Sequence, residues 1–283
     1  MIREPPLQKK KNMNIKQTVK QIIPAQGWTI LRKTYSGLMH LPDLPGVYLH
    51  PWRRESLARL AQLKDIHKGK RAFIIGNGPS LKKTDLSKLR NEFTFGLNRI
   101  YPIFSELGFG TSYYVAVNDL VIEQCREDIT SLPMPKFLSW RSHRFFPAGP
   151  LPATFLYTTY DNPGFARDVR GRLWESATVT YVAMQLAYHM GFDQVILVGV
   201  DHSGSVPGKA NSTIVSQGDD PNHFDPGYFG KGFRWQLPDF DTSEIGYRLA
   251  RQAYEASGRQ LVDATIGGKL TVFPKVEYGS LFG

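Results

Sequence analysis

Three asparagines follow short apolar runs in the sequence and could together form a polar binding site. Asn77 follows "RAFIIG", Asn98 ends "FTFGLN" and Asn118 ends "SYYVAVN", at separations of 21 and 20 residues. Asparagine is a poor strand former, and its amide can both donate and accept hydrogen bonds. A single asparagine is a typical turn residue, but three at successive strand ends indicate a site that reads a base and a ribose. The spacing therefore predicts a nucleotide site.

The turn that contains the first asparagine, "GNGPS", could approach a phosphate. Gly76 and Gly78 allow a sharp turn and close approach of the backbone to a ligand. Pro79 stiffens the turn, and Ser80 can cap the residues that follow, where backbone N–H groups can point at phosphate. The pattern is neither G-x-G-x-x-G nor a Walker loop, so the glycines alone do not identify the compound.

A histidine in a later segment offers acid–base chemistry. His223 is the one histidine within residues 203–242, which are rich in glycine and proline. An imidazole can take a proton from an acceptor hydroxyl; a hydrogen-bonded loop histidine is the alternative. Asp219 and Asp220 could bind a divalent metal through oxygen, but we expect a solvated turn and no metal site. Cys125 is the only cysteine, which excludes an internal disulfide and favours a buried thiol.

The elements that must position these residues are strands and helices, and short apolar runs alternate with helical patterns along the sequence. This alternation predicts a Rossmann-like α/β fold, with a mostly parallel sheet and helices on both faces. Ligands in such folds bind at the carboxyl ends of the strands, where the asparagines are expected. The predicted strands are 71–76, 93–98, 112–118, 136–140, 194–201 and 260–265, and the predicted helices are 54–66, 119–129, 175–191 and 243–258.

The composition divides the chain into two parts. We expect residues 1–50 to form a basic arm with little regular structure, and residues 51–283 to form one catalytic domain. Within that domain, residues 203–242 form a long lid-like loop. Residues 1–70 contain 14 Lys and Arg against 4 Asp and Glu, so they carry the whole net charge of +10. The balanced remainder does not favour nucleic acid as a partner.

The sequence also bears on location. No apolar run approaches the ~20 residues of a membrane-spanning helix, and the first residues lack the pattern of a signal peptide. We therefore expect a cytoplasmic protein. The arm could contact the anionic inner face of a membrane through Ile15, Val19, Ile22 and Ile23 beside lysines, or it could be a solvated basic tail.

The order of these motifs resembles that of two related groups of enzymes. "GNGPSL" after a strand, "LN" on the next strand and "VN" on the third resemble the bacterial sialyltransferase family typified by the Campylobacter lipooligosaccharide enzymes. The likeness continues at "ESATVTYVAMQLAYHMGFDQVILVGVD" and covers residues 71–230. The chain is also similar to the wider group named after the archaeal 6-hydroxymethylpterin pyrophosphokinase, which includes flagellin nonulosonate transferases.

The resemblance implies roles for individual residues at the donor. In the sialyltransferases the asparagines hold the CMP part of the donor, a role that falls here on Asn77, Asn98 and Asn118. The family's donor-contacting serine matches Ser176, which could also cap its helix.

The resemblance is less complete around the leaving group and the base. His202 and Ser203 stand where the family carries two phosphate-supporting tyrosines, and Tyr228 could reach the phosphate from the lid. The family's base falls about four residues after His223, so His202 and Asp201 remain alternatives to it.

Three functions are consistent with these residues. The first is an inverting glycosyltransferase that moves a 2-keto acid sugar, of the sialic acid or Kdo kind, from CMP to a cell-surface glycan. Its acceptor would be a glycan or a lipid-linked glycan, and it would require no cofactor. The second is a diphosphokinase that transfers diphosphate from ATP to a pterin alcohol, with magnesium held by Asp201, Asp219 and Asp220. The third is a nucleotide-binding protein without catalysis.

Overall fold

The structure is a computed structural model that describes residues 25–149, 152–204 and 207–283. The chain forms two compact units, residues 1–44 and 45–283. The first unit contains helix α2 (Ala25–Met39) and the 3-10 turn η1 (Leu41–Asp43). The expected lack of regular structure in residues 1–50 is therefore wrong for the part that the structure describes. The apolar residues predicted to contact a membrane, Ile15, Val19, Ile22 and Ile23, lie outside the described residues.

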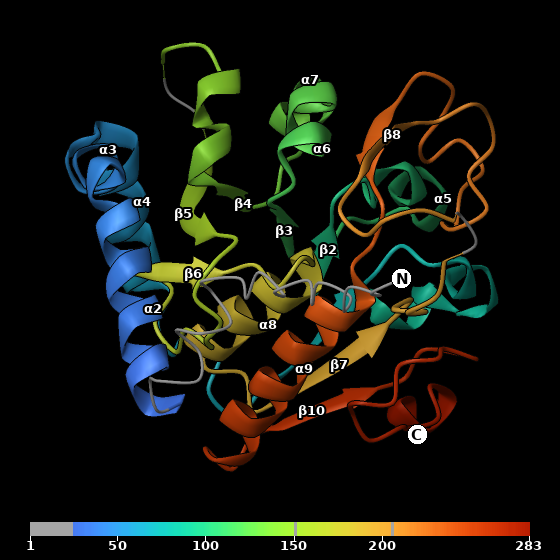
Figure 1. The fold of residues 1–283 in the computed structure, drawn as a ribbon. Helices are drawn as coiled ribbons and strands as arrows, with labels where there is room; N and C mark the ends of the chain where they lie inside the picture. Colours follow the sequence, from blue (N-terminus) through green and yellow to red (C-terminus); the bar gives the residue numbers. More distant parts are fainter. Residues whose placement is uncertain (1–24, 150–151, 205–206) are drawn as a thin grey trace, which may run out of the picture. The chain divides into compact units, whose positions relative to one another are not determined.

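The second unit is built on one eight-stranded sheet, in which all neighbouring strands are parallel (Figure 1). Its strand order is β10-β7-β1-β2-β3-β4-β5-β6. This arrangement confirms the predicted α/β fold with a mostly parallel sheet. The strands are β1 (Arg71–Ile75), β2 (Phe93–Leu97), β3 (Tyr113–Ala116), β4 (Lys136–Ser139), β5 (Ala153–Thr159), β6 (Arg172–Trp174), β7 (Gln194–Val198) and β10 (Gln260–Asp263).

Helices surround this sheet. Among the described residues, none of them combines the length and apolar character that crossing a bilayer requires. The helices are α3 (Leu44–Leu49, at the boundary of the two units), α4 (Pro51–Gln62), α5 (Phe104–Leu107), α6 (Asp119–Gln124), α7 (Arg126–Ser131), α8 (Val179–His189) and α9 (Phe240–Glu255). The 3-10 turns are η2 (Pro79–Lys83), η3 (Leu86–Leu89), η4 (Tyr101–Ile103), η5 (Trp140–Phe145) and η6 (Gly279–Phe282).

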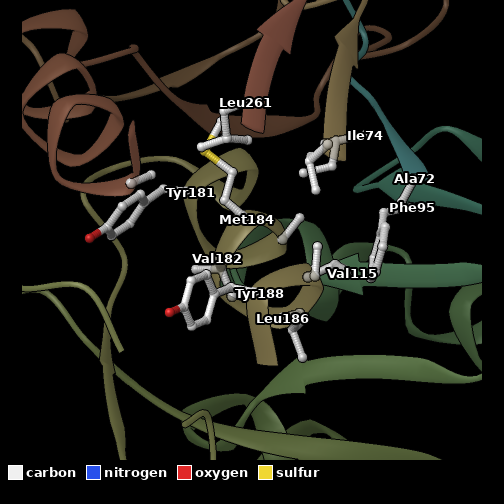
Figure 2. Close-up of a cluster of buried hydrophobic side chains, with 14 of the residues drawn as sticks. Ala72, Ile74, Phe95, Val115, Tyr181, Val182, Met184, Leu186, Tyr188 and Leu261 are labelled. Carbon is white, nitrogen blue, oxygen red and sulfur yellow. The ribbon is translucent and has the colours of Figure 1, made fainter. Parts of the chain in front are cut away.

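Both faces of the sheet are buried under apolar side chains. Because neighbouring residues of a strand point to opposite faces, Ile74 joins one buried cluster and Ile75 joins another. Figure 2 shows the first cluster, to which α8 contributes Met184 and β10 contributes Leu261. The second cluster includes Val121 of α6. Burial on both faces explains why the strands read as continuous apolar runs.

Two strands of the main sheet were not predicted. All seven residues of β5 are buried, yet its sequence, "ATFLYTT", contains three threonines and follows a proline-rich stretch. The three residues of β6, "RLW", are too few to show a period. These two strands extend the sheet at the edge beyond β4, and so they extend the row of strand ends where a ligand can bind.

Three helical and loop predictions need correction. Residues 119–129 form two helices, α6 and α7, which are separated at Cys125. Helix α9 begins at Phe240 with Asp239 as its N-cap, three residues before the expected start at Ser243. Residues 203–242 are not loop throughout, because β8 (Thr213–Val215) and β9 (Arg234–Gln236) pair as an antiparallel hairpin. Whether this lid segment, residues 203–242, moves over a ligand stays a prediction.

The glycine turn after β1 packs directly against the end of β7. The N–H of Gly76 donates to the carbonyl of Val198 at 2.8 Å, and that of Gly78 donates to the carbonyl of Gly199 at 2.9 Å. A Cβ atom on Gly76 would collide with the carbonyl oxygen of Gly199, and one on Gly78 would collide with the carboxylate of Asp201. Glycine is therefore needed at both positions because the residues that follow β7 leave no room for a side chain.

The amide of Ser80 is also occupied. It donates to Oδ1 of Asp201 at 3.2 Å, and the Ser80 hydroxyl donates to Oδ2 at 2.6 Å. A carboxylate thus takes the place that we expected for a phosphate at this turn. The expected role of these backbone N–H groups is corrected, because the amides of Gly76, Gly78 and Ser80 all donate to protein acceptors.

We predict that Gly76→Ala destabilises the protein by about 1–3 kcal/mol, because the new methyl group must displace the backbone carbonyl of Gly199, directly after β7. Urea unfolding followed by circular dichroism would measure the change in the free energy of unfolding. Gly171→Ala is the matched control, since a Cβ atom there meets nothing within 4 Å. Equal stabilities of the two variants would show that the turn does not need its close contact with β7.

Candidate active site

A cavity of about 670 Å³ lies at the carboxyl ends of the sheet strands. The loops after β1, β2, β3, β5, β6 and β7 line it from the sheet, and residues of the lid segment and the start of α9 line it from the other side. The structure therefore brings most of the predicted site residues together. Those that line the cavity are Gly76, Asn77, Gly78, Asn98, Asn118, Asp201, His202, Ser203, His223 and Tyr228, whereas Pro79, Ser80 and Ser176 do not.

Asn77 and Asn98 each present an amide oxygen with hydrogen-bonding capacity to spare. The Asn77 side chain donates through Nδ2 to the carbonyl of Leu97 at 2.9 Å. The Oδ1 atoms of both asparagines are buried and have no hydrogen-bond partner within the described part of the chain. Buried polar atoms are normally paired, so these two acceptors on adjacent strand ends favour a ligand that donates hydrogen bonds. Asn98 also has a positive φ of 47°, a conformation that asparagine adopts more readily than most residues.

Asn118 differs from the other two asparagines because its side chain is bonded within the protein. It is the N-cap of α6, and its Oδ1 accepts from the N–H of Leu120 at 2.9 Å. Its Nδ2 donates to the side chain of Gln236 in β9 at 3.0 Å. Asn118 thus has the turn role that a single asparagine suggests, and it also joins the sheet to the lid segment.

His223 forms a dyad with Asp220. Its Nδ1 lies 2.7 Å from Oδ2 of Asp220, whose side chain is only 3% exposed. Because a carboxylate only accepts hydrogen bonds, Nδ1 carries the proton and Nε2 holds the lone pair of the neutral ring. The other carboxylate oxygen accepts from the backbone N–H of Asn222 at 2.9 Å. A histidine oriented in this way can act as a general base.

The aspartate of this dyad was not recognised from the sequence. We expected Asp220 to lie in a solvated turn, but it is buried and holds the histidine. The signal was the three-residue spacing between Asp220 and His223 within "DDPNH". A carboxylate that far ahead of a histidine in a tight turn can reach its ring.

The ring of Tyr228 packs against the histidine of this dyad. Its ring stacks on the ring of His223, with centroids 4.0 Å apart and planes at 9°. Its hydroxyl is buried and accepts from the backbone N–H of Arg99 at 3.1 Å, and burial raises the pKa of this phenol. Tyr228 thus contacts the histidine and the segment that follows β2, and its expected contact with a phosphate stays a prediction.

Ser176 also lies differently from the expectation. Its side chain is buried and does not line the cavity, and its hydroxyl donates to the carbonyl of Thr242 in α9 at 2.6 Å. The N-cap of α8 is Thr178, whose side chain accepts from the N–H of Thr180. Neither the donor contact nor the capping role proposed for Ser176 is supported by this geometry.

Of the three residues considered after β7, Asp201 is held by the glycine turn, whereas His202 and Ser203 are open to the cavity. The carboxylate of Asp201 accepts from Ser80, which explains its position but leaves it a poor candidate for a base. His202 and Ser203 line the cavity. His202 has a positive φ of 53°, and its Nε2 lies 3.2 Å from the carboxylate of Glu244. Support of a leaving phosphate by His202 or Ser203 stays a prediction.

The carboxylates assigned to magnesium in the diphosphokinase alternative do not converge. Asp201 is bonded to Ser80 and Asp220 is bonded to His223, so both have donors in the protein. Across residues 25–149, 152–204 and 207–283, no group of three or more His, Cys, Asp or Glu side chains is placed to hold a metal ion.

The loops after β5 and β6 contribute residues that the sequence did not indicate. Tyr160 and Glu175 line the cavity. The carboxylate of Glu175 is buried 2.7 Å from Nη2 of Arg141, which lies in η5. Burial raises the pKa of Glu175, and the neighbouring guanidinium of Arg141 opposes that rise. No signal for these residues was available, because both strands that position them were missed.

Two solved structures match this chain at low sequence identity. The first is the MAf glycosyltransferase from Magnetospirillum magneticum AMB-1, with 15% identity and a TM-score of 0.47 over 87% of this chain. This chain spans 42% of the length of that protein. The second is the sialyltransferase CstII from Campylobacter jejuni in complex with cytidine-5'-monophosphate, with 16% identity and a TM-score of 0.41. That match covers 74% of this chain and 85% of CstII.

Sequence comparison gives a more definite result. A search of curated proteins gives no significant match. The family model described as 6-hydroxymethylpterin diphosphokinase MptE-like matches residues 53–206, which are more than half of the chain. The match confirms the resemblance to the pyrophosphokinase group, and the chain belongs to the MptE-like family.

Proposed function

We propose that this protein is an inverting glycosyltransferase that uses a CMP-activated 2-keto acid sugar and a glycan acceptor. The observation that carries the proposal is the dyad of His223 and Asp220, which lies on a cavity at the carboxyl ends of a parallel sheet. A base that is already oriented by a buried carboxylate suits the deprotonation of a hydroxyl nucleophile.

The proposed reaction is a single displacement. The acceptor hydroxyl gives its proton to Nε2 of His223 while its oxygen forms a bond to the anomeric carbon of the donor sugar. The bond from that carbon to the phosphate oxygen breaks, and its electron pair leaves with CMP. Attack opposite the leaving group inverts the anomeric centre. The carboxylate of Asp220 holds the ring and stabilises the imidazolium that forms.

The lining of the cavity offers hydrogen-bond acceptors to a nucleoside. Asn77 and Asn98 offer two buried acceptor oxygens to hydroxyl or amino groups of a nucleoside. Among the described lining residues none is lysine or arginine, whereas Glu175, Asp201 and Asp239 are acidic. A CMP-linked 2-keto acid sugar carries a negative charge on its phosphate and another on its carboxylate, and ATP bound to magnesium carries a similar net charge, so the charge of this lining does not separate the two donors.

Diphosphate transfer from ATP to a pterin alcohol is the second candidate, and the description of the family favours it. The dyad of His223 and Asp220 could equally deprotonate a pterin hydroxyl, with AMP in place of CMP as the leaving group. Thermal unfolding with CMP, and with ATP and magnesium, distinguishes the two. A ligand at 100 times its dissociation constant adds about 2.7 kcal/mol to the stability of the protein.

We predict that His223→Ala lowers turnover by about 10²–10⁴-fold, while CMP binding stays within a few-fold. Asp220→Asn should also lower turnover, because it removes the charge that orients the ring. Turnover of the parent should fall at acid pH, since a protonated imidazole accepts no proton. The residual turnover of His223→Ala should lack this fall. The assay is transfer from CMP-sialic acid or CMP-Kdo to a panel of glycans.

His143→Ala is the control for this prediction, because His143 is a half-buried histidine that does not line the cavity. His202→Ala should be run in parallel, as a test of support for the leaving phosphate. Full turnover by His223→Ala would remove this histidine from the mechanism and make His202 the next candidate for the base.

We predict that Asn98→Ala weakens CMP binding by about 1–3 kcal/mol, because donor groups of the bound nucleotide lose a buried acceptor. Isothermal titration calorimetry would measure the dissociation constant. Asn162→Ala is a matched control, since Asn162 also has a positive φ but does not line the cavity. Equal CMP affinity of Asn98→Ala and the parent would place the nucleotide elsewhere.

We also propose that the N-terminal unit contacts an anionic membrane surface. Helix α2 exposes five large apolar side chains, and residues 1–44 contain eight Lys and Arg against two Asp and Glu, a net charge of +6. Apolar area and positive charge together favour adsorption to anionic lipid. The exposed side chains are Ile30, Leu31, Tyr35, Leu38 and Met39.

We predict that the double variant Leu31→Glu/Leu38→Glu binds vesicles of anionic lipid about tenfold or more weakly, because it removes apolar area and adds negative charge. Co-sedimentation with phosphatidylglycerol vesicles at low salt would measure the binding. Ile66→Glu, an exposed isoleucine of the second unit, is the control. Unchanged binding of the double variant would show that α2 does not contact the membrane.

A further inference from the structure

The cavity extends far beyond the strand end beside His223. The lid residue next to this histidine, Phe224, donates its backbone N–H to the carbonyl of Asn77 at 2.9 Å, which places the dyad near the end of β1. Tyr160 follows β5, and the strand order β1-β2-β3-β4-β5 puts it four strands away. With strands about 4.8 Å apart, the two strand ends are on the order of 19 Å from each other. One cavity is lined from both.

Tyr160 is an exposed aromatic side chain that is nevertheless held in place. It is 64% exposed. The guanidinium of Arg141 lies 4.2 Å from its ring centroid, and Nη2 of Arg141 donates to its hydroxyl at 2.9 Å. The indole N–H of Trp174 donates to its backbone carbonyl at 3.1 Å. Backbone, hydroxyl and one side of the ring are therefore fixed.

The group that holds Tyr160 is itself fixed. Arg141 donates to the buried carboxylate of Glu175 and to the carbonyl of Thr158, each at 2.7 Å. A ring fixed by such contacts loses little conformational entropy when a ligand stacks on it. An ordinary exposed tyrosine has no need of this support.

The charges around Tyr160 balance. Arg141 and Arg144 face two carboxylates, Asp119 and Glu175, through ion pairs of 3.9 Å or less. With no net charge around it, the aromatic surface suits an uncharged ring. A pyranose has an apolar face of C–H groups that can pack on the negative face of an aromatic ring.

We propose that Tyr160 is the stacking surface of an acceptor subsite that binds a remote ring of a neutral oligosaccharide. The reacting hydroxyl of that oligosaccharide lies at His223, and the chain of sugars runs along the strand ends towards β5. This inference rests on the proposed glycosyl transfer and adds the class of acceptor. It implies that longer neutral glycans bind better than single sugars.

Saturation-transfer NMR on the full chain with CMP present tests the proposal without requiring turnover. The probes are lacto-N-neotetraose, maltotetraose and mannotetraose, each compared with its non-reducing terminal monosaccharide as the methyl glycoside. At least one tetrasaccharide should bind, and Tyr160→Ala should weaken that binding about three- to tenfold. Tyr160→Phe, which keeps the ring, should retain most of the affinity. Tyr48→Ala is the control, because Tyr48 is an exposed tyrosine outside the cavity.

The outcomes separate this inference from the proposed function. Failure of every tetrasaccharide to bind, or equal binding to Tyr160→Ala and the parent, overturns the acceptor subsite. Tyr160-dependent binding of 6-hydroxymethylpterin in place of a glycan also overturns it. Tyr160-dependent glycan binding by a protein that does not consume CMP-sialic acid or CMP-Kdo would support the subsite and contradict the proposed donor.

Discussion

The hydrogen bonds between Asp201 and Ser80 determine where a ligand can lie in this protein. Strands β1 and β7 pair in parallel, with Ile75 opposite Val198, so the segments that follow the two strands leave the sheet side by side. The carboxylate of Asp201 then accepts hydrogen bonds from both the backbone N–H and the hydroxyl of Ser80. An anion at the same turn would be repelled by this carboxylate. The glycine turn is consequently part of the scaffold, and the groups with free hydrogen-bonding capacity are those that the turn positions, beginning with Asn77.

The position of His223 depends on a second set of contacts, which joins the lid segment to the strand ends. Tyr228 bonds to the backbone of Arg99, and Gln236 bonds to Asn118. Because His223 stacks on Tyr228, these contacts also hold the imidazole in place. Each contact uses a polar group at the end of a different strand, so the sheet sets the position of a histidine that belongs to an irregular segment. Preorganisation of this kind lowers the cost of orienting a catalytic group.

Much of this fold could be predicted from the sequence, because strands buried on both faces read as apolar runs. The six predicted strands are present, and the sheet is parallel as expected. The failures have physical causes. The threonines of β5 are buried between neighbouring strands, where the hydroxyl of Thr158 bonds to Ser139, and no sequence period reveals this. Missing β5 and β6 meant missing Tyr160 and Glu175, because a side chain cannot be assigned to a cavity before its strand is assigned to a sheet.

The sequence could not show which of several residues of one type face the cavity with a free polar group and which are used up in local structure. The amides of Asn77 and Asn98 have free acceptor atoms, whereas Asn118 satisfies its own in a helix cap. Sequence spacing makes the three look equivalent; the difference arises because a helix starts immediately after Asn118 and supplies N–H groups that need an acceptor. Asp220 shows the same limit. It is buried, and its carboxylate accepts from the backbone N–H of Asn222 and holds the ring of His223, contacts that arise only when the lid segment is folded. The capacity of this site for acid–base chemistry is thus a property of the folded lid segment and of the strand ends that hold it.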